Sequence, residues 1–205
     1  MLTRIGEPTE VFLTLAQVKL ALRISTSAED DYLQSLIEVA RQYLDGSTGI
    51  LGRCLRPQTW RWDLPCGPSG KSLEVPLPPT ISVDLIQYYD SNAVLQTWDS
   101  TYYRVVTGGF CGAKIVRKPT YTWPPCLHPS YGYPDVFQVT FQAGYAPGAE
   151  SPTTEQIPEP IREAAILMIG DWFENRVNTL VGTSAIELPN AAAMLLAPYR
   201  MQRFG

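Results

Sequence analysis

The sequence predicts an α+β protein: a small helical bundle core with an inserted antiparallel β module and a C-terminal arm. Apolar residues recur at helical spacing in residues 1–53 and again in residues 149–189. Between them, residues 54–148 alternate apolar and polar side chains in short segments separated by turns rich in Pro, Gly, Asn and Asp. The last segment, residues 190–205, is apolar and aromatic, whereas most chain ends are polar.

The composition is that of a globular chain. Its 205 residues are 45% hydrophobic and 18% charged, which excludes wholesale disorder. The net charge of −4 excludes a phosphate-neutralising surface over the protein as a whole. No long apolar run is present, so we expect neither a membrane span nor a signal peptide. The cysteines form no CxxC pair, and we expect reduced thiols at all four: Cys54, Cys66, Cys111 and Cys126.

Two helices are predicted for residues 1–53. The first has Thr14 as its N-cap and Gln17 three residues later, which is a capping box. The second is expected to begin at a Ser27 cap, after a connection of about three residues, and to end at Gly46. Its apolar residues share one face at helical spacing: Leu33, Leu36, Ile37, Ala40 and Leu44.

Five to seven short antiparallel strands are expected in residues 54–148, with one face of the sheet in water. The clearest strand is DVFQVTFQAGY, in which Phe137, Val139 and Phe141 lie on one face. Residues 118–135 hold too many prolines for regular structure, so we expect a long exposed loop there.

Residues 149–189 begin as a linker by composition and continue into a long helix. Pro160 suits the first helical position. The middle of the helix, IREAAILMIGDWF, is apolar nearly all round, which is typical of a helix that is buried on several sides. We therefore expect it to be the central helix, packed against the two N-terminal ones.

No catalytic or metal-binding constellation stands out. The stretch GPSGKS has Pro65 where a phosphate loop needs a glycine, and a strand-like segment follows it. His128 is the single histidine, so a His-rich metal site is excluded. Pairing His128 with Cys126 or Ser130 as base and nucleophile lacks an orienting third group. We expect no enzyme activity, no metal and no cofactor.

Aromatic residues are more informative, because five Trp and eleven Tyr are present and many fall in the β module and its loops. Ordinary core and strand packing is one explanation. The alternative is a contact surface, since Trp, Tyr and Arg concentrate where binding energy is high. A loop cannot bury many rings in its own core, so the candidate partner-contact loop comprises Tyr121, Trp123, Tyr131 and Tyr133.

The chain ends in NAAAMLLAPYRMQRFG. Asn190 is a good N-cap, and Pro198 limits this helix to about two turns, too short to be stable alone in water. We expect the helix to dock on its own subunit or a neighbour and Pro198 to redirect the residues that follow. Those residues combine apolar side chains with arginine guanidinium groups, which can donate two parallel hydrogen bonds, as the anchor residues of an interface do.

Three segments resemble the head–tail connector (adaptor, or head-completion) family of tailed bacteriophages, prophages and gene-transfer particles. They are LTLAQVKLALRISTSAEDDYLQSLIEVARQYLDGSTGILG, VFQVTFQAGYAPG followed by IPEPIREAAILMIGDWFENR, and the ending LLAPYR. The resemblance implies a structural protein without enzymatic activity. It also implies a ring, usually matched to the twelvefold symmetry of the portal, that docks under the portal after DNA packaging.

The implied partners are the portal protein, neighbouring copies in a homo-oligomeric ring, and the next neck or tail protein, a stopper or tail terminator. DNA would pass through the ring without sequence-specific binding, and no membrane is involved. The implied location is the virion neck, between head and tail, after assembly in the host cytoplasm. In the family the C-terminal segment reaches the portal, which places Leu195, Leu196, Tyr199 and Arg200 at that contact. With their neighbours, the expected portal-contact arm is Leu195, Leu196, Pro198, Tyr199, Arg200, Met201, Arg203 and Phe204.

Two alternatives stay open from the residues alone. The aromatic β region would also suit an unrelated binding module, for example one that reads carbohydrate, and Trp123 would then carry glycan binding. A small enzyme is the third hypothesis. The sequence shows no set of acid, base, nucleophile or metal ligands that would support it.

Overall fold

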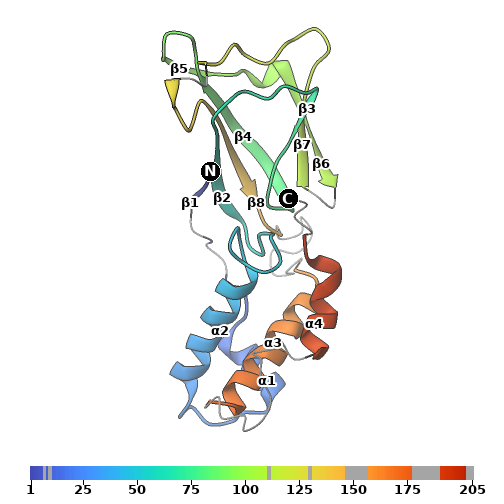
Figure 1. The fold of residues 1–205 in the computed structure, drawn as a ribbon. Coiled ribbons are helices and arrows are strands. Elements are labelled where there is room, and N and C mark those ends of the chain that lie inside the picture. Colours follow the sequence, from blue (N-terminus) through green and yellow to red (C-terminus); the bar gives the residue numbers. More distant parts are fainter. Residues whose placement is uncertain are drawn as a thin grey trace. The chain divides into compact units, whose positions relative to one another are not determined.

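The computed structural model describes residues 1–6, 8, 11–109, 112–128, 131–145, 157–176 and 190–201. The chain forms two compact units, which are described separately below. Residues 1–10 and 56–154 make the strand unit, and residues 11–55 and 155–205 make the helical unit. Figure 1 shows the two kinds of structure segregated in this way, which confirms the predicted α+β class.

The larger sheet of the strand unit has five antiparallel strands in the order β1-β2-β8-β4-β5. They are β1 (Leu2–Gly6), β2 (Gln58–Leu64), β8 (Phe137–Ala143), β4 (Thr80–Tyr89) and β5 (Leu95–Thr97). Strand β8 is central, and its Phe137, Val139 and Phe141 are fully buried, as their alternation predicts. The opposite face is less exposed than we expected. Asp63 and Gln138, which oppose each other there, are both buried.

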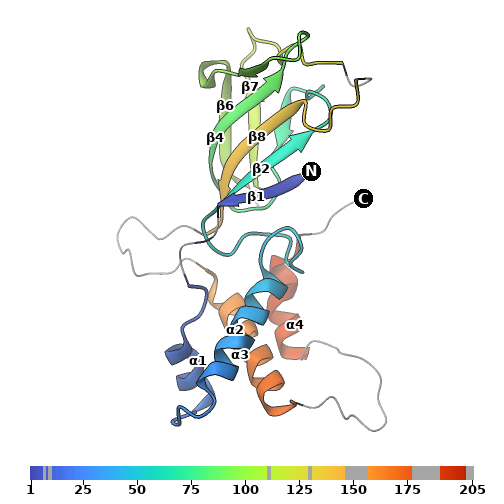
Figure 2. The same ribbon diagram turned by 90° about the vertical axis from the view of Figure 1, so that its left-hand side faces the viewer.

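A smaller antiparallel sheet has the order β3-β7-β6. Its strands are β3 (Ser72–Glu74), β7 (Gly112–Arg117) and β6 (Tyr103–Gly109), and the 3-10 turn Ser100–Tyr102 precedes β6. Figures 1 and 2 together show this sheet lying across one face of the larger one. The core of the unit lies between the sheets, where Ala113 and Ile115 of β7 are buried.

Strand β1 differs from the prediction, which assigned residues 1–53 to the helical core. Leu2 pairs with Trp62 and Arg4 with Trp60, so residues 2–6 extend the larger sheet at its edge. The segment LTRIG lacks a strong alternation of its own, and Ile5 stays 54% exposed. Its conformation comes from hydrogen bonds to β2, a partner more than fifty residues away in the sequence.

The helical unit contains α1 (Leu15–Leu22), α2 (Asp30–Leu44), α3 (Glu159–Glu174) and α4 (Asn190–Leu196). The predicted capping box is present. The Gln17 amide nitrogen donates to Thr14 Oγ1 over 3.2 Å, and the Thr14 amide nitrogen donates to Gln17 Oε1 over 2.9 Å. The five predicted apolar residues of α2 are its buried set.

The connection between α1 and α2 corrects the prediction. It spans residues 23–29 instead of about three residues, because Arg23 adopts a left-handed conformation (φ 58°) that ends α1 early. Glu29, and not Ser27, occupies the N-cap position of α2, and its side chain makes no capping bond. Asp30 and Asp31 in the first turn supply the favourable negative charge near the helix N-terminus.

Helix α3 contacts each of the other three helices, which confirms that it is central to this unit. It begins one residue earlier than predicted, so Pro160 is in its second position, where a missing N–H costs no helical bond. Its buried residues are Ile161, Ala164, Ala165, Met168 and Ile169. Leu167 is 41% exposed, so one side of α3 faces away from the core.

Candidate docking surfaces

Helix α4 docks on its own helical unit, against α3. Ala192 and Leu196 are four residues apart and are fully buried, so they form its inner face. Ala191, Met194 and Pro198 follow at spacings of three and four residues, and all three are exposed. Met194 is 76% exposed, which is unusual for an apolar side chain of this size. The segment therefore presents an apolar outer stripe while its inner face anchors it.

After α4, a 3-10 turn (Ala197–Tyr199) redirects the chain, and Arg200 is extended. The Met201 amide nitrogen donates to the Leu51 carbonyl over 2.9 Å. The Arg53 guanidinium carbon lies 5.9 Å from the centroid of the Tyr199 ring, at the distance of a cation–π contact. Residues 199–201 thus lie against the loop of residues 51–53 in the same helical unit.

The loop of residues 51–53 requires glycine at position 52. Gly52 has φ 64°, and a Cβ added there would be 3.2 Å from Met201 Cβ. A side chain at this position would be strained by the backbone conformation and would crowd the docked segment.

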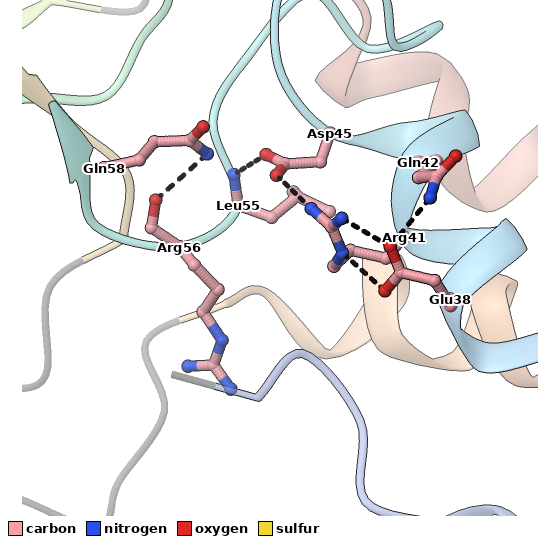
Figure 3. Close-up of polar contacts among 7 residues, drawn as sticks. All are labelled: Glu38, Arg41, Gln42, Asp45, Leu55, Arg56 and Gln58. Atoms are coloured by element: carbon pink, nitrogen blue, oxygen red, sulfur yellow. Dashed lines mark hydrogen bonds and ion pairs between the residues drawn. The ribbon is translucent and has the colours of Figure 1, made fainter. Parts of the chain in front are cut away.

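The C-terminal end of α2 holds the loop in place. Gly46, with φ 78°, follows the helix and its amide nitrogen donates to the Arg53 carbonyl over 2.8 Å. Asp45 is only 6% exposed, and its Oδ1 accepts a hydrogen bond from the Leu55 amide nitrogen over 2.7 Å. Its Oδ2 lies 3.5 Å from Arg41 Nη1 (Figure 3).

Figure 3 shows that this network continues along the exposed side of α2. Arg41 Nε donates to Glu38 Oε2 over 2.9 Å, and the Gln42 side-chain amide donates to Glu38 Oε1 over 2.8 Å. In the strand unit, separately, the Gln58 side-chain amide donates to the Arg56 carbonyl over 3.3 Å. Glu38 thereby orients Arg41, and Arg41 balances the buried charge of Asp45.

The residues of the predicted portal-contact arm fall into four groups. Leu196 is buried in the helical unit, and Leu195, Tyr199 and Met201 are half-buried against it. Pro198 and Arg200 are exposed. Arg203 and Phe204 lie outside the described residues. The predicted arm did not include Met194, because the apolar sequence around it does not indicate which side of α4 faces inward.

Trp123, from the candidate partner-contact loop, is used within the strand unit. Its indole N–H donates to the Gly70 carbonyl over 2.6 Å, and its ring centroid lies 4.9 Å from that of Trp98. It also meets Phe137 edge-on at 6.1 Å. Because both its ring and its polar group have partners inside the unit, Trp123 acts as a packing residue.

The tyrosines of the loop are more accessible. Tyr121 is 41% exposed with its ring 4.7 Å from Tyr102, and Tyr133 is 42% exposed with its ring 5.7 Å from Tyr89. Tyr131 is 69% exposed. Residues 118–128 lie outside every strand and helix, as the prolines predicted. The accessible aromatic surface of the loop is therefore provided by tyrosines.

Two titratable side chains of this region have raised pKa values. Burial, with a smaller effect from Cys66, raises the pKa of the half-buried Cys126 thiol to about 11, so it is protonated at neutral pH. Burial is the main reason that the pKa of Tyr103 is raised, and the negative charges of Asp99 and Asp84 raise it further. Within the described ranges, no group of three or more His, Cys, Asp or Glu side chains is placed to hold a metal ion.

We predict different reactivities for the two free thiols near this loop. Cys66 is exposed and should be alkylated readily at pH 8, whereas Cys126, with its pKa of about 11, should react far more slowly. At pH 8 only about one Cys126 side chain in a thousand is a thiolate. Iodoacetamide labelling followed by peptide mass spectrometry measures both rates at once. The rate at Cys126 should still rise between pH 9 and 10.5, and equal rates at pH 8 would contradict the assignment.

We also predict that Asp45→Ala lowers the free energy of unfolding by about 3 kcal/mol, because it leaves the Leu55 amide buried without its acceptor and removes the buried partner of Arg41. The matched control is Glu38→Ala, which removes the exposed partner of the same arginine and should cost at most about 1 kcal/mol. Urea denaturation followed by circular dichroism measures both. Equal losses for the two variants would show that Asp45 does not hold the loop.

We compared the chain with known protein families and sequences. Residues 12–92 match the family described as phage gp6-like head-tail connector protein. No curated protein sequence matches. None of the helices in the described ranges has the length and apolar character that crossing a membrane requires.

Solved structures match the fold over nearly the whole chain. One is a chain from the "Neck of empty GTA particle computed with C6 symmetry", with a TM-score of 0.72 and 19% identity. Another is from the "Virion of native gene transfer agent (GTA) particle", with a TM-score of 0.71 and 20% identity. A third is from the "Neck of native GTA particle computed with C12 symmetry", with a TM-score of 0.65 and 17% identity. Each alignment covers 99% of this chain and 96% of the other. The resemblance to head–tail connectors that the sequence indicates is confirmed.

Proposed function

We propose that this chain, a protein of the head–tail connector type, is a structural adaptor in the neck of a phage-like particle. In this proposal it forms a ring of twelve copies beneath the portal and links the DNA-filled head to the next neck or tail protein. The observation that carries the proposal is the likeness to neck chains of gene transfer agent particles, which extends over 99% of this chain. Its role is mechanical, and we assign it no catalytic step.

A closed ring needs two different surfaces on each copy, one of which meets the other on the neighbouring copy. The helical unit has apolar side chains available for this. Val39 and Tyr43 are 50% and 40% exposed and lie one turn apart on α2, where Tyr43 also contacts Trp172 edge-on at 6.5 Å. Leu20 of α1 is 82% exposed. We assign the ring contacts to these helical faces.

The portal contact is assigned to the C-terminal segment. Its inner face is used within the subunit, so the portal would meet the outer stripe of Met194 and Pro198, together with Arg200 and the residues after it. Apolar side chains beside an arginine are the composition at which binding energy concentrates. The docking of residues 199–201 on the 51–53 loop would give the contact a fixed starting point, which lowers the entropy lost on binding.

The remaining parts of the proposal follow from charge and location. With a net charge of −4, the chain suits a channel through which DNA passes without sequence-specific binding. Assembly would take place in the host cytoplasm, and the mature position would be the virion neck. A carbohydrate-reading function is not favoured, because Trp123, its best platform, is packed against Trp98 and Phe137.

We predict that Arg200→Glu weakens attachment to portal-bearing heads by about tenfold or more and leaves the free energy of unfolding unchanged, because Arg200 is exposed. Deletion of residues 202–205 should have the same effect. The matched control is Arg23→Glu, an exposed arginine of the same helical unit, which should attach normally. Co-sedimentation with purified heads measures attachment, and thermal unfolding measures folding. Normal attachment of both arm variants would refute the portal role of the arm.

We predict that the purified subunit is monomeric or weakly associated in analytical ultracentrifugation and that the portal promotes the ring. A cryo-EM map of the neck should then show twelve copies around the channel. A stable isolated dimer, or a map with this chain absent from the neck, would overturn the adaptor proposal.

A further inference from the structure

The strand unit carries a basic hollow that plays no part in the adaptor proposal above. Its volume is about 720 Å³, within the range of sites that bind ligands, and it lies where β7 ends and the 118–128 segment begins. Among the described residues, six line it: Lys71, Arg104, Val116, Arg117, Lys118 and Pro119. Strand pairing brings them together, since Val116 of β7 is opposite Arg104 on one side and Ser72 on the other.

The hollow concentrates positive charge on an acidic protein. Four of the six described residues that line it are cationic, whereas the whole chain has a net charge of −4. In the described part of the chain, none of the four has a carboxylate within ion-pair distance. Lys114, two residues before Val116 on the same strand, is different, because its Nζ lies 2.7 Å from Glu74 Oε1.

Two of the cations are held in place by backbone carbonyls. Arg117 Nη1 donates to the Tyr121 carbonyl over 2.7 Å, and Lys118 Nζ donates to the Thr101 carbonyl over 2.6 Å. Lys71 and Arg104 also line the hollow and are exposed. A carbonyl satisfies a donor and leaves the charge uncompensated, so the hollow keeps its positive potential. This arrangement favours an anionic ligand, whose charge would be drawn in from a distance.

The shape of the hollow favours carboxylates on a peptide over the phosphates of a nucleic acid. Val116 and Pro119 provide apolar lining between the cations. A duplex would need cations spread along a strip that follows its backbone, and its phosphates would leave the apolar lining uncovered. An extended peptide with alternating acidic and apolar side chains would cover both parts, with Arg104 available for a two-pronged contact to a carboxylate.

We propose that this basic hollow binds an acidic segment of a partner protein, in which Asp or Glu residues alternate with apolar ones. Arg104 and Lys71 bind its carboxylates, and Val116 and Pro119 accept its apolar side chains. The inference rests on the strand unit alone and holds whether or not the chain occupies a particle neck.

The test uses the full chain and three fluorescein-labelled probes in anisotropy titrations at 50 and 200 mM salt. The probes are a ten-residue peptide alternating Glu and Leu, its Gln and Leu analogue, and a duplex oligonucleotide. The acidic peptide should bind, and the neutral analogue should bind at least about tenfold more weakly. Arg104→Glu should weaken binding of the acidic peptide by about tenfold or more. The matched control Arg4→Glu makes the same charge change at an exposed position of β1 and should change binding less than about twofold.

Several outcomes would overturn the proposal. If Arg104→Glu and Arg4→Glu lost the same affinity for the acidic peptide, binding would reflect net charge alone. Tighter binding of the duplex than of the acidic peptide would identify a nucleic-acid site, and no binding of the acidic peptide at 50 mM salt would refute the site. Circular dichroism checks that Arg104→Glu folds. If it does not, Lys71→Glu, in the turn before β3, must produce the same tenfold loss.

Discussion

One buried carboxylate, that of Asp45, holds the loop that receives the C-terminal segment of the helical unit. Asp45 ends α2, accepts the Leu55 amide at 2.7 Å and is balanced by Arg41, so the chain between them must close into a fixed loop. A buried charge is tolerated only when it is paired and hydrogen-bonded, and both conditions are met here. The loop in turn provides the Leu51 carbonyl and the Arg53 side chain that receive the C-terminal segment.

This constraint gives the C-terminal segment two faces with different tasks. A helix as short as α4 cannot be stable in water without packing, and the burial of Ala192 and Leu196 supplies that packing. The opposite stripe, with Met194 and Pro198, is then presented on a rigid support instead of a flexible tail. In the ring proposed above, every copy makes the same contact, and such a support limits the entropy lost at each one.

In the strand unit, packing against the core holds the proline-rich loop in place. Its central strand β8 is buried on one face by three apolar side chains, and Trp123 ties the proline-rich loop to that core. At the start of the same loop, Lys118 is held at the basic hollow by bonds from its Nζ to the Thr101 carbonyl and from its amide nitrogen to the Tyr102 carbonyl. Rigid placement of this irregular segment is what allows charged and aromatic side chains there to form defined surfaces.

The sequence by itself determined the features that depend on neighbours within a few residues: the Thr14 capping box, the buried stripe of α2 and the inner face of β8. Helical and strand periodicity are local, so they can be read without a partner. Only the tertiary structure decided that residues 2–6 form a strand, that Trp123 is packed, and that Leu196 faces inward while Met194 faces outward. It also assembled Lys71, Arg104 and Lys118 into one hollow. Each of these depends on contacts between segments far apart in the chain, and no local pattern records such contacts.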